Sequence, residues 1–223
     1  GLIVASAMSG REIKFYRDLI QDGAKIVLID RVLDGLRCSA VTTDDVQVGV
    51  LATEHLLELG HRRIGHLRGT NASTSLQRLE GYRQALAKAR IRVNKNFVRE
   101  CGFTEADGYA AMKAWIAAGD LPTAIFAAND PAAIGAMTAA NEAGVNVPGD
   151  VAFAGAGSIH YGDMLRVPLT TVAWSTAAMG QAAAELLLEA VADKGKEHKP
   201  RRIVIPPQLV VRESSGRKKP KNS

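Results

Sequence analysis

The chain has 223 residues, of which 47% are hydrophobic and 23% are charged. This composition excludes a disordered or collagen-like chain and fits one large globular domain or two smaller lobes. The formal net charge is +5, but four basic residues lie among the last seven, and without them 24 basic residues face 23 acidic ones. The body of the chain is therefore nearly neutral, which gives no support to a strongly basic DNA-binding surface on it.

Cysteine content and hydropathy exclude two further classes of protein. Two cysteines, Cys38 and Cys101, are too few for a disulfide scaffold, and we expect both to be small buried side chains. No stretch approaches the roughly 18 apolar residues of a membrane span. Because the chain opens on an apolar, strand-like run and not on methionine, we expect that it continues a longer natural sequence.

Short apolar runs alternate along the chain with longer amphipathic segments, and glycines end most of the latter. In chain order, the pattern predicts strand 2–7, helix 11–21, strand 25–30, strand 39–43, helix 45–59, strand 63–67, helix 75–89, strand 97–101, helix 105–118, strand 123–128, helix 130–143, strand 151–154, strand 169–174, helix 177–192, strand 202–205 and strand 209–211. The third of these strands is followed by Asp44 and Asp45, either of which suits the helix N-cap.

This succession predicts an α/β protein. Strands that are almost continuously apolar and are separated by helices form parallel sheets covered on both faces. The right-handed crossover rule favours open, doubly wound sheets, and the helix–strand sets on either side of residue 60 predict two such lobes. Ligands of such sheets bind beyond the carboxyl ends of the strands, so residues that directly follow strands are the candidate ligand contacts.

Seven sequence segments, in order and with matching spacing, resemble the effector-binding part of LacI-family transcription regulators. They are IVLIDR at 26–31, ATEHLLELGHRRI at 52–64, RLEGY at 78–82, PTAIFAAND at 122–130, EAGVNVPGDV at 142–151, PLTTV at 168–172 and LVVRES at 209–214. The resemblance runs from residue 1 to about 215. It implies two lobes of the type I periplasmic-binding-protein kind: residues 1–59 plus 175–206, and residues 60–174 plus 207–215. Residues 216–223 are then a basic tail, which we expect to be disordered.

The same resemblance implies a role and partners. Such regulators are bacterial, cytoplasmic homodimers without catalytic activity, cofactor or membrane contact. An N-terminal helix-turn-helix headpiece binds operator DNA, and an effector, here expected to be a sugar or sugar derivative, binds between the lobes. Residue 1 matches about the third strand of the first lobe, so the headpiece, the hinge and two strand–helix units are expected to precede this chain. Helix 11–21 and outer helices of the second lobe are expected at the dimer interface.

Four candidate ligand contacts follow from this resemblance. Arg78 matches an arginine that enters the cleft, where its guanidinium suits paired hydroxyls or a carboxylate; otherwise it is a surface helix residue paired with Glu80 or a neighbour. Thr74 lies in the same loop. Phe103 matches an aromatic that stacks on a ring, although a lone phenylalanine is more often core.

The fourth contact is Asn129, whose amide suits a sugar hydroxyl, while we expect its neighbour Asp130 to be the N-cap of the following helix.

One segment departs from the family pattern. Gly157 stands where family members usually carry an acidic residue that accepts hydrogen bonds from ligand hydroxyls, and Ser158 is the expected weaker substitute. A sugar would lose a charge-assisted hydrogen bond, about 1.5–3 kcal/mol. Either the ligand differs from a free sugar, or another group replaces the acid. Trp174 is larger than the usual polar residue at the lobe crossing, so it narrows the cleft or adds a second stacking face.

Other chemistries find little support. Gly155 and Gly157 begin a G-x-G pattern, but the third glycine of a dinucleotide loop is replaced by His160. Ser158, His160 and Asp163 are the residue types of a hydrolase triad, yet they lie within six positions and no G-x-S-x-G elbow exists. The histidines at 55, 61 and 66 lack metal-site spacing on one helix face. We therefore expect no metal or cofactor.

The alternative function is a periplasmic sugar-binding protein that delivers its ligand to a transporter. It would share both lobes and the cleft, and the upstream sequence separates the two: a helix-turn-helix favours the regulator and a signal peptide the transporter component. The LVVRES ending at 209–214 favours the regulator.

Overall fold

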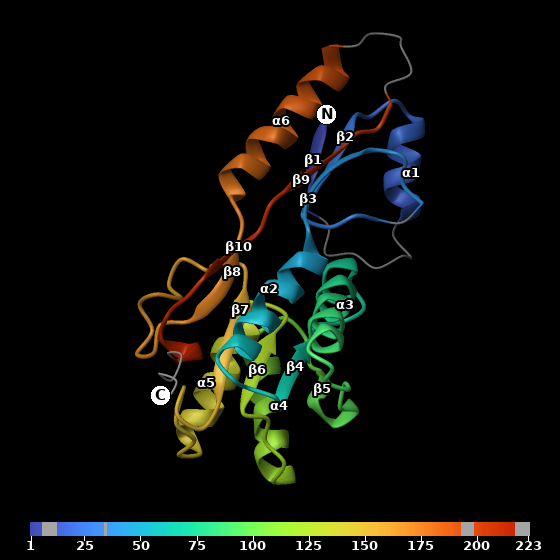
Figure 1. The fold of residues 1–223 in the computed structure, drawn as a ribbon. Helices are drawn as coiled ribbons and strands as arrows, with labels where there is room; N and C mark the ends of the chain where they lie inside the picture. Colours follow the sequence, from blue (N-terminus) through green and yellow to red (C-terminus); the bar gives the residue numbers. More distant parts are fainter. Residues whose placement is uncertain (6–12, 34, 193–198, 217–223) are drawn as a thin grey trace. The chain divides into compact units, whose positions relative to one another are not determined.

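A computed structural model describes residues 1–5, 13–33, 35–192 and 199–216, and it divides the chain into two compact units (Figure 1). The first unit consists of residues 1–44, 72–74 and 174–206, and the second of residues 45–71, 75–173 and 207 onward. The boundaries between the units include those between residues 173 and 174 and between residues 206 and 207. Another falls between Asp44 and Asp45, so α2 (Asp45–Glu58) is grouped with the second unit.

The first unit holds a four-stranded parallel sheet with one helix on each face. Its strands, in the order β1-β2-β3-β9, are β1 (Leu2–Val4), β2 (Ile26–Ile29), β3 (Ser39–Thr43) and β9 (Arg202–Ile205), and its helices are α1 (Ile13–Gln21) and α6 (Thr176–Ala192). Ile26 and Leu28 of β2 pack with Tyr16 of α1, while Val27 packs with Met179 of α6. This alternation along one strand is the reason that the strand reads as a continuous apolar run.

The second unit holds a six-stranded sheet in the order β10-β8-β7-β6-β4-β5 (Figure 1). Its strands are β4 (Ile64–Arg68), β5 (Val98–Glu100), β6 (Ala124–Ala127), β7 (Ala152–Ala156), β8 (Thr170–Ala173) and β10 (Gln208–Val210). All of the pairings are parallel except that of β10 with β8, which is antiparallel. The α/β fold with two parallel-sheet lobes is thus confirmed, with one antiparallel edge strand that the hydrophobic pattern did not reveal.

Helices cover both faces of this second sheet. The helices α4 (Glu105–Ala118) and α5 (Asp130–Glu142) bury one face around Trp115 and Phe153. On the other face, α2 packs against β6, β7, β8 and β10, and α3 (Ser73–Lys88) supplies Tyr82. There the ring of His66 lies stacked between those of Tyr82 and Phe126, with centroids 5.2 and 4.8 Å apart.

Two glycines let α2 and α3 cross at backbone distance. A Cβ atom on Gly49 would collide with the carbonyl oxygen of Arg78, and one on Gly81 would collide with the carbonyl oxygen of Val46. No other residue type fits this crossing without separating the helices. The crossing also explains why α2 belongs with the second unit and not with the first.

The predicted elements are found with bounds shifted by a few residues, and the short 3-10 turns Lys95–Phe97 and Glu213–Ser215 are additional. Cys38 and Cys101 are free thiols and half-buried. Residues 6–7 of the first predicted strand, residues 11–12 of the first predicted helix and residues 217–223 of the predicted tail lie outside the described residues. Within the described ranges, no helix combines the length and apolar character needed to cross a membrane.

Candidate functional site

Residues that follow the strands β4, β5, β6 and β7 of the second unit contact one another at one edge of the sheet. The ring of Phe103 lies against Gly69, where a Cβ atom would overlap it. The Phe103 carbonyl oxygen accepts a hydrogen bond of 2.7 Å from the Asn129 side chain, and Asp130 accepts one of 2.7 Å from the Ile159 backbone N–H. These contacts join the ends of four strands, as expected for the carboxyl edge of a parallel sheet.

Arg78 is buried in an ion pair. Its Nε and Nη2 both donate to Oδ1 of Asp45 at 2.7 Å, and its Nη1 donates to the Ala128 carbonyl oxygen at 2.5 Å. The side chains of both charged partners are less than a tenth exposed. The alternative of a surface arginine paired with Glu80 is therefore wrong, since Glu80 instead accepts a hydrogen bond from Gln84. The guanidinium ties α3 to the start of α2 and to the end of β6.

Asn129, and not Asp130, is the residue that caps the helix after β6. Asn129 is the N-cap of α5: its backbone is extended, with φ of −150°, and its Oδ1 accepts a hydrogen bond of 3.1 Å from the Ala132 N–H. The prediction that Asp130 is the cap is wrong, because Asp130 is already the first residue of the helix. Both ends of the Asn129 amide thus have protein partners, its Nδ2 being bound to the carbonyl oxygen of Phe103.

Asp130 is almost fully buried and holds the segment after β7 in place. Its Oδ1 accepts a hydrogen bond of 2.6 Å from the Thr171 hydroxyl, and its Oδ2 accepts the one from the Ile159 N–H. Burial raises the pKa of this carboxyl, while its two hydrogen bonds and the charges of Arg212 and Arg78 act in the opposite direction.

The segment that departs from the family pattern has an unusual backbone. Gly157 has a φ of +126° and Ser158 a φ of +54°, and only glycine adopts such angles readily. The Ser158 N–H donates to the Thr171 hydroxyl oxygen at 3.3 Å. A Cβ atom on Gly157 would lie 3.8 Å from Oδ2 of Asp130, so the carboxylate of Asp130 lies beside the position of the missing acid.

Thr74 and Trp174, the two other candidate contacts, are grouped with the first unit. Thr74 is buried near the start of α3, and Trp174 is half-buried against the core around Val27 and Met179. The neighbour of Thr74, Ser75, was not among the predicted residues. Its hydroxyl is fully buried and makes no hydrogen bond within the part of the chain that the structure describes, which is an unusual state for a buried polar group.

Comparisons with known proteins fit this geometry. Residues 53–215 match the family model of the periplasmic binding protein-like domain. A solved LacI-family regulator from Sanguibacter keddieii is 33% identical, with a TM-score of 0.86, over 97% of this chain and 79% of that one. This chain belongs to the LacI family.

Two further similar proteins extend the comparison. The regulator CelR, solved as a complex with cellobiose, is 32% identical with a TM-score of 0.87, over 96% of this chain and 65% of that one. The HTH-type transcriptional repressor PurR of Haemophilus influenzae is 38% identical over 168 residues, 74% of this chain and 50% of the relative. The chain thus spans about half the length of the curated relatives it matches. Its family is one of transcription regulators and not of enzymes.

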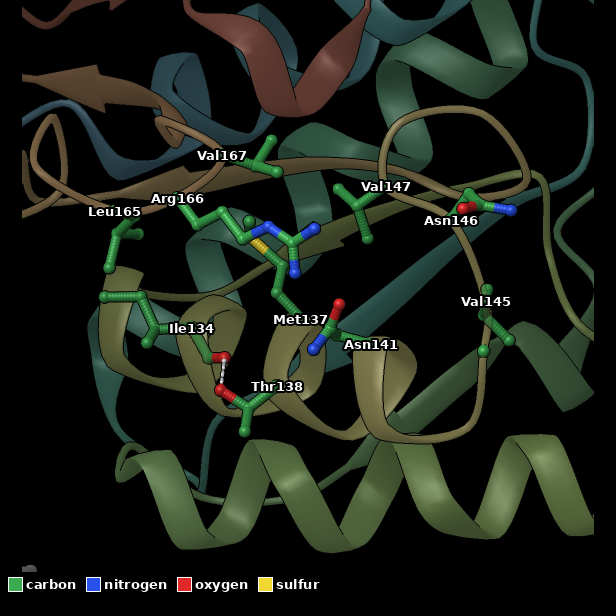
Figure 2. Close-up of a pocket in the computed structure, with 11 residues that line it drawn as sticks. Ile134, Met137, Thr138, Asn141, Val145, Asn146, Val147, Leu165, Arg166 and Val167 are labelled. Carbon is green, nitrogen blue, oxygen red and sulfur yellow. Dashed lines mark hydrogen bonds between the residues drawn. The ribbon is translucent and has the colours of Figure 1, made fainter.

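This LacI-family chain has a concavity of about 340 Å³ that none of the six candidate ligand contacts lines (Figure 2). It lies between the C-terminal half of α5 and the segments that lead into β7 and β8, hence towards the amino ends of those strands. Ile134, Met137 and Leu165 supply apolar surface, and Figure 2 shows Arg166 extending above Met137. Nothing in the sequence pattern had indicated it.

The remaining candidate chemistries of this LacI-family chain were also compared with the structure. No cluster of three or more potential metal-binding side chains occurs among the residues described. His61 bonds Thr123 at 3.1 Å, and His55 bonds Ser215 at 2.9 Å. His160 packs edge-on against the ring of its neighbour Tyr161.

Proposed function

We propose that this chain is the effector-sensing part of a bacterial DNA-binding regulator and that its effector is a small polyhydroxylated molecule, a sugar or a sugar derivative. The observation that carries the proposal is the meeting of an aromatic ring, Phe103, with polar groups at the carboxyl edge of the second sheet. An aromatic face suits the C–H face of a sugar ring, and neighbouring amide and hydroxyl groups suit its hydroxyls. The similarity to a regulator solved with cellobiose supports the same ligand class.

In this proposal, Arg78, Phe103, Asn129 and Ser158 contact the effector from the second unit, and Thr74 and Trp174 contact it from the first. Binding to both units favours one of their relative arrangements, because a ligand shifts a conformational equilibrium towards the state that it binds better. In the whole protein, the shift changes how two headpieces fit two operator half-sites.

DNA binding and dimerisation belong to the whole cytoplasmic protein in this proposal. The similarity to HTH-type repressors, of which the 168 matched residues make up 50%, supports a headpiece outside this chain. For the dimer, the outer surface of α5 around Ile134 and Leu165 is the favoured contact on the second unit, because it is concave and partly apolar (Figure 2).

Calorimetry on the intact protein tests the ligand site, with cellobiose and ribose as the first probes. We expect Phe103→Ala to weaken sugar binding at least tenfold, because the stacking face is lost. The control is Leu188→Ala, which removes an exposed apolar side chain of α6 and should leave the affinity unchanged. An unaltered affinity for Phe103→Ala would contradict this site.

Gel-shift titration tests whether specific DNA binding requires the headpiece in addition to this chain. Residues 1–223 alone should give no sequence-specific shift of operator DNA at physiological salt, whereas the intact regulator should. A specific shift by residues 1–223 would contradict the proposal. Reading the upstream sequence decides between this function and a periplasmic transporter component, as a helix-turn-helix supports the former and a signal peptide the latter.

A further inference from the structure

The positive charge of Arg78 is matched within the protein by a buried carboxylate. Asp45 accepts two hydrogen bonds from the guanidinium, each 2.7 Å long, and the two side chains are 6% and 4% exposed. At such burial, each charge depends on the other, because removal of either leaves an uncompensated ion in a medium of low dielectric.

The pairing follows from the glycine crossing of α2 and α3. Asp45 lies one turn before Gly49 on α2, and Arg78 lies one turn before Gly81 on α3. Because Gly49 and Gly81 bring the two backbones into contact, the ends of the two side chains meet above the end of β6, where Ala128 accepts the third hydrogen bond. The position of Asp45 is thus built into the helix packing.

Charge at this edge of the sheet disfavours an anionic ligand. A phosphate or carboxylate that bound Arg78 would have to displace Asp45 from the guanidinium and leave its carboxylate buried. Asp130, a second buried carboxylate, accepts a hydrogen bond from Ile159 in the segment after β7 and would also repel an anionic ligand. By contrast, an uncharged hydroxyl binds without altering the charge balance. The Ser75 hydroxyl, three residues before Arg78 on α3, makes no hydrogen bond within the described residues and is a neutral group beside the ion pair on the same helix face.

We propose that Asp45 is a positioning residue that neutralises Arg78 and thereby restricts the effector to uncharged, hydroxyl-bearing molecules, to the exclusion of phosphorylated or carboxylated ones. This inference rests on the proposed function, since it specifies the ligand class of the same site. It assigns to Asp45 a role in selectivity that its place at a helix start does not reveal.

The test compares matched ligand pairs on the intact regulator by thermal shift and calorimetry. The pairs are glucose with glucose 6-phosphate, ribose with ribose 5-phosphate and cellobiose with cellobionate, and inorganic phosphate is a probe that requires no knowledge of the effector. The wild type should bind the neutral member of any responding pair at least tenfold more tightly and should not respond to phosphate. Asp45→Asn should shift the ratio at least tenfold towards the anionic member and should gain stabilisation by phosphate.

A double variant separates charge from structure. Asp45→Asn with Arg78→Gln keeps hydrogen-bonding groups at both positions but removes both charges, so it should fold without gaining phosphate binding. If Asp45→Asn alone fails to fold, the inference is still tested by the affinity ratio of neutral to anionic ligands in the wild type and by phosphate binding in the double variant. The inference is overturned if an anionic member binds the wild type as tightly as its neutral partner, or if a folded Asp45→Asn protein gains no response to phosphate. A panel in which neutral sugars and their anionic partners all fail to bind contradicts the proposed function, whereas the phosphate result judges Asp45 separately.

Discussion

At the residue scale, Gly157 combines a missing side chain with a backbone that tolerates none. Its φ of +126° lies where L-residues are strained, and its neighbour Ser158 also has a positive φ. Residues held in such regions cost about 1–3 kcal/mol each and occur where the surrounding structure over-determines them. Here the hydrogen bonds of Asp130 and Thr171 to the following backbone supply that constraint.

Restoring an acid at this position should therefore fail. We expect Gly157→Asp to lower the free energy of unfolding by about 2–4 kcal/mol, because backbone strain adds to repulsion by Asp130. Gly144→Asp is the matched control. Gly144 also has a positive φ, +74°, but among the described residues nothing lies within 4 Å of a Cβ atom at this position. Urea denaturation measures both, and equal losses for the two variants would show that Asp130 plays no part.

A buried histidine provides a pH-dependent prediction. The Nδ1–H group of His66 donates a hydrogen bond of 2.9 Å to the Phe126 carbonyl oxygen, because a carbonyl oxygen can only accept. Its buried Nε2 has no partner within the described residues. Burial lowers the pKa of His66 to about 4, so the ring is neutral in the folded protein near pH 7.

The unfolded chain binds a proton at His66 once the pH falls below the ordinary value of about 6.5, whereas the folded chain does so only near 4. As the pH falls from roughly 6.5 to 4, His66 should therefore lower the free energy of unfolding by about 1.4 kcal/mol for each pH unit. His66→Phe should be about 1 kcal/mol less stable at pH 7, since the Phe126 carbonyl loses its donor. The difference in stability between the wild type and His66→Phe should narrow or reverse by pH 4.5, because only the wild type carries this titrating ring. Parallel stability curves for the two proteins would contradict the assignment.

At the scale of elements, the crossing of α2 and α3 is the contact on which the candidate site depends. Helix packing at backbone distance requires glycine, although glycine within a helix otherwise costs about 1 kcal/mol relative to alanine. Both glycines therefore look unfavourable when each helix is considered alone. Their contacts with Arg78 and Val46 supply the reason for them.

Alanine substitutions distinguish packing glycines from a glycine without that role. We expect Gly49→Ala and Gly81→Ala each to destabilise the protein by about 2–4 kcal/mol, because the helices must separate. Gly180→Ala in α6 is the control. A Cβ atom there meets no atom of the structurally described part within 4 Å, so this change should stabilise the protein by up to about 1 kcal/mol. Thermal unfolding of the three variants tests the contrast, and losses of similar size at all three positions would refute the close crossing.

At the scale of the whole molecule, the described end of the chain closes the second unit. The Ser214 hydroxyl donates to the Phe153 carbonyl oxygen at 2.8 Å and accepts from the Thr170 N–H at 2.8 Å. The Ser215 hydroxyl forms hydrogen bonds with the Thr170 hydroxyl, at 2.8 Å, and with Nε2 of His55, at 2.9 Å. A buried polar cluster thus joins β7, β8 and α2 to residues near the end of the part of the chain that the structure describes.

Loss of this cluster should affect the global stability of the second unit. Ser214→Ala leaves a buried N–H and a buried carbonyl oxygen without partners, so we expect a loss of about 2–4 kcal/mol. Thr138→Ala, which removes an exposed hydroxyl bonded to its own helix, should change stability by less than about 0.5 kcal/mol. Hydrogen exchange of β7 and β8 locates the effect. Unchanged protection in Ser214→Ala would exclude a closing role.

The order of elements, the α/β fold and the family could all be inferred from local patterns. Apolar runs, helical spacing and terminal glycines act within a few residues, so β2, α4 and α5 are found close to their predicted bounds. The direction of β10 was not evident, because a strand of three residues pairs in either sense until its neighbour is known. Its antiparallel pairing with β8 depends on how the chain returns to the sheet.

The candidate site shows the same division between local and distant causes. The sequence pattern indicated which residues follow strands. Two of these residues, Phe103 and Asn129, do meet at the carboxyl edge of the second sheet. The partner of Arg78 lies 33 positions earlier, and nothing in the pattern of either helix marks Asp45 for that role. Charges so far apart in sequence pair only when two helices approach closely enough, and here two glycines permit that approach. Burial then turns an ordinary N-terminal aspartate into the group that balances the charge of the site.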